Sequence, residues 1–89
     1  MSADLSADPP LGWTVVDRGG VGVLTRTFTF NDWAGALAFV NRVGAVADAQ
    51  DHHPVVDFTW GRVTLFSWSH DVKGLTGRDQ RFCLAVNDL

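Results

Sequence analysis

The sequence has only one cysteine, Cys83, among its 89 residues. A single cysteine excludes an intrachain disulfide and any zinc or iron–sulfur site built from several cysteines. Cys83 lies within the apolar run "RFCLAV", so we expect it to pack as a small buried hydrophobic residue rather than to act as a reactive thiol.

Concentrated positive charge is also missing. Seven Lys and Arg residues are scattered along a chain with a net charge of −3. Nucleic acid and anionic membranes are bound chiefly through clustered positive charge, so we expect neither as a partner. No apolar run approaches the roughly 20 residues that span a bilayer. The start "MSADLSADPPLGW" lacks the basic and apolar regions of a secretory signal, which predicts a cytoplasmic protein.

Three common catalytic or nucleotide-binding motifs are absent: the P-loop, the dinucleotide-binding G-x-G-x-x-G and the hydrolase elbow G-x-S-x-G. The glycine-rich "GGVG" at 19–22 falls between two apolar runs, where a hairpin turn needs glycine.

The length predicts one domain with a thin core. We expect residues 1–10 to be a flexible lead-in and residues 11–89 to be the folded domain. Because a thin core without disulfides is marginally stable, association of subunits is expected to help stabilise it.

Two hairpins, each followed by a helix, are predicted. Leu24, Phe28 and Phe30 alternate with threonines, which is typical of a strand with one face buried. The expected order is β-β-α-β-β-α, an α+β fold with a four-stranded antiparallel sheet and helices on one face. The predicted strands are 13–17, 21–30, 55–60 and 62–69, and the predicted helices follow residues 31 and 76.

The first helix is expected to begin at Asn31 as its N-cap, with Asp32 in its first turn. The second is expected to begin with a capping box formed by Thr76 and Asp79. The first helix is predicted to bury one stripe of residues, namely Trp33, Ala36, Leu37, Val40, Val43, Gly44 and Ala47. For the second, the predicted stripe is Phe82, Leu84 or Ala85, and Leu89.

All three histidines lie near the ends of the second predicted hairpin. His52 and His53 precede it and His70 follows it, so antiparallel pairing brings them to the same end of the sheet. Three readings remain open: a proton-transfer site, a three-histidine metal site and ordinary surface histidines. The adjacent pair argues against metal, since neighbouring residues in extended backbone point to opposite sides.

These residues carry a family resemblance. Asp48, then His52-His53-Pro54, Trp60, His70 and Asp79 have the spacing found in pterin-4a-carbinolamine dehydratases, a family also described as a dimerization cofactor of a homeodomain transcription factor. The likeness extends to "GW" at 12–13, "LTRTFTFNDW" and "GLTGRD" and covers roughly residues 12–88.

The resemblance implies dehydration of 4a-hydroxytetrahydropterin to quinonoid dihydropterin by histidine acid–base catalysis. It implies no cofactor and no metal, a pterin substrate and a homodimer or homotetramer. The implied catalytic residues are His52, His53, His70 and Asp48. The implied substrate-binding residues are Asp51, Pro54, Trp60, Trp68, Ser69, Asp71 and Asp79.

The sequence also departs from the family pattern. Asp48 is one methylene shorter than the usual glutamate, Val56 replaces a tryptophan common in animal members, and Ser67 stands at an apolar position. The N-terminal helix expected before "GW" is shortened or absent. The alternative function is a non-catalytic oligomerising or regulatory binding module on the same fold.

Overall fold

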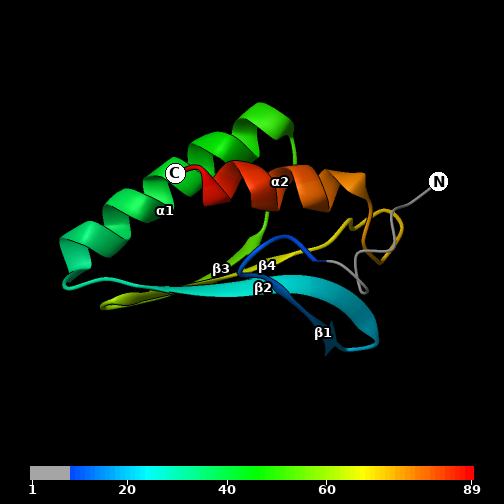
Figure 1. Cartoon of the computed structure of the whole chain (residues 1–89), viewed down its shortest axis with the longest axis horizontal. Helices are drawn as coiled ribbons and strands as arrows, with labels where there is room; N and C mark the ends of the chain where they lie inside the picture. The colour runs from blue at the N-terminus through cyan, green and yellow to red at the C-terminus, as the bar shows by residue number, and fades with distance from the viewer. Residues whose placement is uncertain (1–8) are drawn as a thin grey trace.

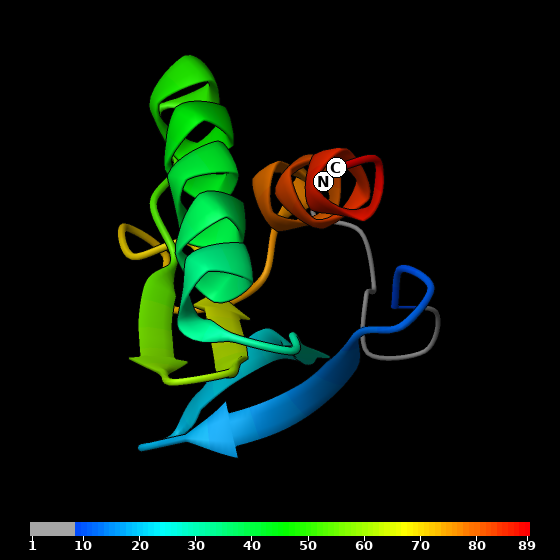
Figure 2. The same cartoon turned by 90° about the vertical axis from the view of Figure 1, so that its left-hand side faces the viewer.

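In the computed structural model, which describes residues 9–89, two helices cover one face of a four-stranded sheet (Figures 1 and 2). The strands are β1 (Thr14–Arg18), β2 (Val21–Thr29), β3 (Val55–Thr59) and β4 (Arg62–Ser67). The helices are α1 (Trp33–Gln50) and α2 (Gly77–Asn87). The predicted α+β fold and its β-β-α-β-β-α order are therefore confirmed.

The sheet has the order β1-β2-β4-β3 and is antiparallel throughout. Its central pairing joins β2 to β4, for example Leu24 with Ser67 and Phe28 with Val63. Paired residues point to the same face, so Leu24, Val63 and Leu65 all face the helices. The alternation predicted for residues 21–30 is confirmed.

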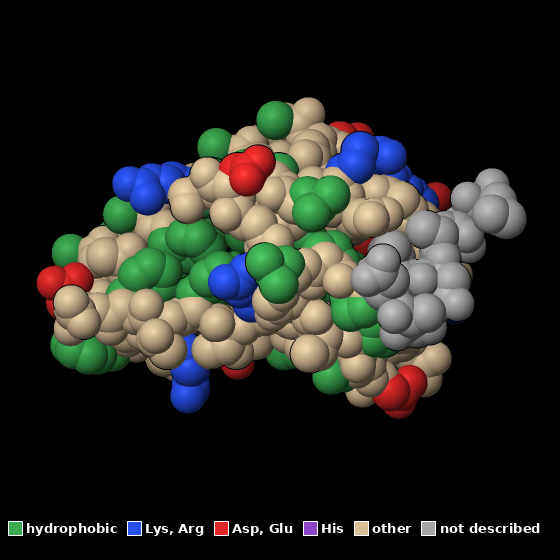
Figure 3. Space-filling model, in the orientation of Figure 1, with side chains coloured by type: hydrophobic (Ala, Val, Ile, Leu, Met, Phe, Trp, Pro, Cys, Tyr) green, Lys and Arg blue, Asp and Glu red, His purple; other side chains and the backbone are tan. Residues whose placement is uncertain are grey.

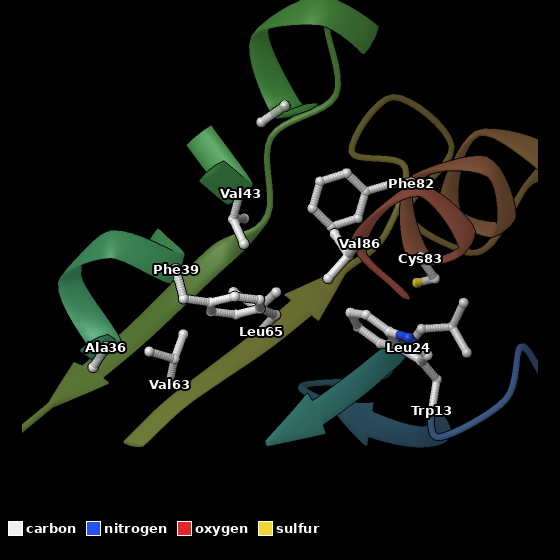
Figure 4. Close-up of a cluster of buried hydrophobic side chains, with 11 residues drawn as sticks. Trp13, Leu24, Ala36, Phe39, Val43, Val63, Leu65, Phe82, Cys83 and Val86 are labelled. Carbon is white, nitrogen blue, oxygen red and sulfur yellow. The ribbon is translucent and has the colours of Figure 1, made fainter. Parts of the chain in front are cut away.

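The core lies between this sheet face and the two helices (Figure 4). Phe39 and Val43 of α1 meet Val63 and Leu65 of β4, while Phe82 of α2 lies beside them. Cys83 is fully buried, and burial together with the negative charge of Asp79 raises the pKa of its thiol far above the ordinary value. The predicted burial of Cys83 is therefore confirmed.

The buried stripes of both helices agree in part with the predicted ones: Ala36, Val43, Ala47 and Phe82 are buried as predicted. In α1 the buried residues are Ala36, Phe39, Val43 and Ala47, whereas Trp33 and Leu37 are exposed. Trp33 instead stacks on Phe58 of β3 at the edge of the sheet. In α2 the buried apolar residues are Phe82, Cys83 and Val86, and the predicted Leu84 and Leu89 are exposed. The cause is the same in both helices, since periodicity fixes the spacing of a stripe but not which of two adjacent stripes faces the sheet.

An open hollow of about 460 Å³ lies between β2 and the two helices. Hydrophobic side chains gather there around a basic one in the space-filling view, and no histidine is visible on this face (Figure 3). The histidines therefore lie elsewhere on the molecule.

The expected lead-in, residues 1–10, falls mostly outside the described residues, as does the shortened N-terminal helix. Pro10 is described and buried, and its carbonyl accepts a hydrogen bond from the backbone of Trp13. Among the described residues, no helix is both long enough and apolar enough to cross a membrane.

The N-cap of α1 is Asp32 rather than the predicted Asn31. Asp32 has extended backbone, and its Oδ1 accepts a hydrogen bond from the backbone of Gly35 at 2.8 Å. The capping box predicted for α2 is confirmed, with Thr76 as N-cap and Asp79 as its partner.

We therefore expect Asp32→Ala to lower the free energy of unfolding by about 1 kcal/mol, because the first turn of α1 loses its acceptor. Urea unfolding measures this change, and Asn31→Ala is the matched control with little effect. Equal losses in the two variants would contradict the assignment of the cap.

Candidate functional site

The site begins where α1 ends. Asp51 caps the helix in the left-handed conformation (φ 50, ψ 44), which aspartate tolerates better than most residues. The backbone of His52 then donates to the carbonyl of Ala47 at 3.0 Å. This turn directs the His52 side chain inward, and the residue is only 7% exposed.

Asp79, in the first turn of α2, receives the His52 ring. Its Oδ1 lies 2.7 Å from Nε2 of His52 and accepts from the Ser67 hydroxyl at 2.7 Å. Its Oδ2 accepts from the Ser69 hydroxyl at 2.8 Å and from the backbone N–H of Thr76 at 3.0 Å. Four donors therefore fill the acceptor sites of a fully buried carboxylate. We call these five residues the Asp79 cluster.

The cluster fixes the tautomer of neutral His52. Since Asp79 offers only acceptor atoms to these donors, Nε2 of His52 carries the proton and Nδ1 keeps its lone pair. No hydrogen bond to Nδ1 is found among residues 9–89, and no buried side-chain nitrogen or oxygen in that range lacks a partner. Nδ1 is therefore at the solvent-accessible edge of the ring, where it can accept a proton.

His53 lies on the rim instead of the floor. Its Nε2 is 2.9 Å from Oδ1 of Asp48 in the last turns of α1, and both side chains are largely exposed. Asp48 thus reaches a histidine although it is one methylene shorter than glutamate. Two adjacent histidines are turned to different partners, as the extended backbone predicts.

His70 follows β4 and is exposed. Its ring stacks on Trp68, with centroids 4.4 Å apart and an angle of 13° between the planes. Trp68 faces a separate hollow on the outer side of the sheet, beside Val21 and Val23. Trp68 therefore packs against the ring of His70 and does not line the histidine depression.

The three histidines meet in one open depression of about 390 Å³, a size within the usual range for small-molecule sites. Its lining consists of Asp51, His52, His53, His70, Asp71 and Arg78. The chain thus brings together the end of α1, the loop after β4 and the start of α2.

Arg78 and Asp71 form an ion pair across the depression, with 2.7 Å between Nη2 and Oδ1. The hydrogen bond from Arg78 lowers the pKa of Asp71 below its ordinary value of 3.8. Arg78 was not among the residues expected from sequence. Its only signal is its place just before Asp79 in the first turn of the second predicted helix.

Several expected substrate-binding residues lie elsewhere. Trp60 is in the turn between β3 and β4, at the opposite end of the hairpin, and is 64% exposed. Asp79 and Ser69 are fully buried, and their oxygens are engaged within the protein. These two residues support His52 and have no free surface for a substrate. Pro54 and Trp68 do not line the depression.

The described part of the chain contains no cluster of side chains that fits the alternative of a metal site. Among residues 9–89, no group of three or more His, Cys, Asp or Glu side chains is arranged to hold a metal ion. Nε2 of His52 and Nε2 of His53 are already engaged by different carboxylates.

Comparisons with known proteins agree with the geometry. The family described as "Pterin 4 alpha carbinolamine dehydratase" matches residues 1–89. The chain belongs to this family. It is 48% identical over 63 residues to a protein of Chlorobaculum tepidum and 51% identical over 67 residues to one of Chlorobium limicola. Both relatives carry the name "Putative pterin-4-alpha-carbinolamine dehydratase".

These alignments cover 71% and 75% of this chain but only 57% and 59% of the two relatives. The chain therefore spans less than two thirds of their length. Among solved structures, a transcriptional coactivator/pterin dehydratase from Brucella melitensis has a TM-score of 0.80 at 31% identity, covering 88% of this chain and 81% of its own.

A second structure, a pterin dehydratase-like protein identified as a RuBisCO assembly factor in the alpha-carboxysome, has a TM-score of 0.73 at 18% identity. It covers 89% of this chain and 89% of its own. At this identity the likeness concerns the fold alone.

We expect Arg78→Ala to raise the pKa of Asp71 back toward 3.8, because the guanidinium no longer stabilises the carboxylate. Because the pKa of Asp71 is lowered in the folded protein, its pair with Arg78 stabilises the fold at pH values above the ordinary pKa of 3.8. This stabilisation is lost as the pH falls through the lowered pKa. A carboxyl NMR titration measures the change, with Arg81→Ala as control. An unchanged titration in Arg78→Ala would contradict the pair.

Proposed function

We propose that this protein dehydrates 4a-hydroxytetrahydropterin to quinonoid dihydropterin, and thereby acts as a hydro-lyase in recycling a tetrahydropterin cofactor. The observation that carries the proposal is His52, whose Nε2 is held by Asp79 and whose side chain lines a depression shared with His53 and His70. Membership of the dehydratase family supports the same reaction.

His52 is the proposed general base. The reaction removes the proton from N5 of the pterin, and Nδ1 of neutral His52 is the acceptor. Asp79 remains a carboxylate and stabilises the imidazolium that forms, since its charge lies 2.7 Å from Nε2. A fixed tautomer saves the reorganisation that a freely rotating histidine would need.

The proton for the leaving group comes from one of the two rim histidines, His53 or His70. The protonated imidazole donates to the 4a-hydroxyl, the bond between C4a and oxygen breaks, and water leaves. The electron pair of the N5–H bond forms the N5=C4a double bond. Protons and electrons balance within the substrate and two histidines, so the reaction needs no metal or organic cofactor.

The remaining lining groups suit a polar heterocycle. The proposed substrate contacts are Asp51, Asp71 and the guanidinium of Arg78, which present acceptors and donors around the depression. Asp48 orients His53 on the rim through its 2.9 Å contact.

His52→Ala should lower the rate of dehydration of synthetic 4a-hydroxytetrahydropterin by about 10²–10⁴-fold, the usual contribution of a general base. Asp57→Asn is the matched control, because Asp57 is an exposed carboxyl residue on β3 outside the depression. A His52→Ala protein with the full rate would refute the proposed role of His52. An unaltered protein without dehydratase activity would favour the binding-module alternative, for which the dehydratase-like assembly factor is a precedent.

The general acid can be identified from pH–rate profiles of His53→Ala and His70→Ala. The acid must be protonated to act, so its removal should abolish the fall in rate on the alkaline side of the profile. The variant of the other rim histidine should keep that fall. An unchanged alkaline side in both variants would show that neither histidine is the acid.

We also propose that the protein is a homodimer or homotetramer, as its family and thin core suggest. Exposed apolar side chains such as Trp33, Leu37 and Val56 lie along α1 and β3 and offer area for such contacts. Light scattering after size-exclusion chromatography measures the mass directly. A monomer at micromolar concentration would contradict this proposal.

A further inference from the structure

Ser67 places a hydroxyl in an otherwise apolar row. It follows Val63 and Leu65 on the inner face of β4, and all three are fully buried. A buried hydroxyl costs free energy unless it is hydrogen-bonded, so Ser67 needs a partner in the core. At the sequence level this serine is a departure from the apolar residue expected at its position.

The partner of Ser67 is the same oxygen that holds the base. Ser67 Oγ donates to Oδ1 of Asp79 at 2.7 Å, and Nε2 of His52 lies 2.7 Å from that atom. Ser67 Oγ and Nε2 of His52 are themselves 3.3 Å apart, so the three atoms form a compact triangle. Ser69 and Thr76 donate to the other oxygen, Oδ2. Among residues 9–89, Ser67 is thus the one residue that shares Oδ1 with His52.

We propose that Ser67 is a positioning residue that keeps His52 available as a base. This inference rests on the proposed dehydration. Two donors on one carboxylate oxygen share its negative charge, so each hydrogen bond is weaker than it would be alone. The Ser67 hydroxyl therefore reduces the pull of Asp79 on the His52 proton while holding the carboxylate in place. His52 stays fixed in one tautomer without being locked as the imidazolium.

The other charged groups around His52 leave this triangle intact. Cys83 of α2 is near Asp79, but its thiol stays neutral because burial raises its pKa. Asp48 is engaged with His53, and Asp71 with Arg78. The groups that share the depression with His52 are Asp51, His53, His70, Asp71 and Arg78. Substitution of Ser67 changes none of them.

The test compares Ser67→Ala and Ser67→Cys. Alanine removes the hydroxyl, and cysteine keeps a side chain of similar size but donates only weakly. Both substitutions should move the acidic limb of the pH–rate profile toward higher pH. Without the Ser67 hydroxyl, Oδ1 of Asp79 interacts with His52 alone and favours its protonated form. We expect about a three- to tenfold loss of kcat/KM at the acidic end, the range that one hydrogen bond supplies. The rate on the plateau should change little.

The matched control is Thr64→Ala. Thr64 lies on the same strand but on the opposite face, where its hydroxyl pairs with Thr27 at 2.9 Å. This variant also loses one hydroxyl hydrogen bond, yet it should leave the acidic limb in place. A merely structural role for Ser67 would lower the unfolding temperature without moving that limb.

A second readout does not depend on activity. In the proton NMR spectrum of the folded protein, the Nε2–H signal of His52 should move downfield in both Ser67 variants, since its bond to Asp79 strengthens. The proposal would be overturned if the acidic limb of the pH–rate profile stayed in place or moved to lower pH in the Ser67 variants. An unchanged position of the Nε2–H signal would also overturn it. If the unaltered protein lacks dehydratase activity, the proposed function fails, and the NMR signal still decides whether Ser67 shares Oδ1 as proposed.

Discussion

The buried carboxylate of Asp79 is the group on which the rest of the structure depends. One side chain closes the capping box of α2, accepts from the hydroxyls of Ser67 at the end of β4 and Ser69 just beyond it, and holds the ring of His52 after α1. None of its hydrogen-bond partners carries a permanent positive charge. Four hydrogen bonds therefore compensate for the burial of the carboxylate. Loss of one partner would leave part of that charge uncompensated, which ties the packing of three segments to the chemistry of one histidine.

The site consequently has a fixed half and an open half. His52 is held on the floor by buried groups, while His53, His70 and the pair of Asp71 and Arg78 lie on an accessible rim. In the proposed reaction, a base that must keep one tautomer benefits from a rigid and water-poor setting. In the same proposal, the rim groups admit the substrate and release water, for which exposure is favourable. The two halves meet within two residues of the chain, because the adjacent His52 and His53 point to different partners, Asp79 and Asp48.

Sequence patterns predicted the elements well and their details less well. The alternation from Leu24 to Phe28 revealed a half-buried strand, and the capping box at Thr76 marked the start of a helix. The N-cap at Asp32 was missed by one residue because Asn31 is an equally good cap chemically. The position of Trp60 could be read from the hairpin, since a residue at the turn lies at the far end from the strand termini. The spacing motif drew attention to Trp60 without indicating its place in space.

The sequence by itself determined the fold class and the convergence of His52, His53 and His70, because both follow from local periodicity and one tight hairpin. Only the tertiary structure decided that β4 pairs with β2, that α1 presents Phe39 to the core and that Asp79 is hydrogen-bonded to His52. These outcomes depend on contacts between residues far apart in the chain. Asp79 and His52 are 27 positions apart and Ser67 lies 12 from Asp79. Local patterns carry no record of which distant donor reaches which carboxylate oxygen.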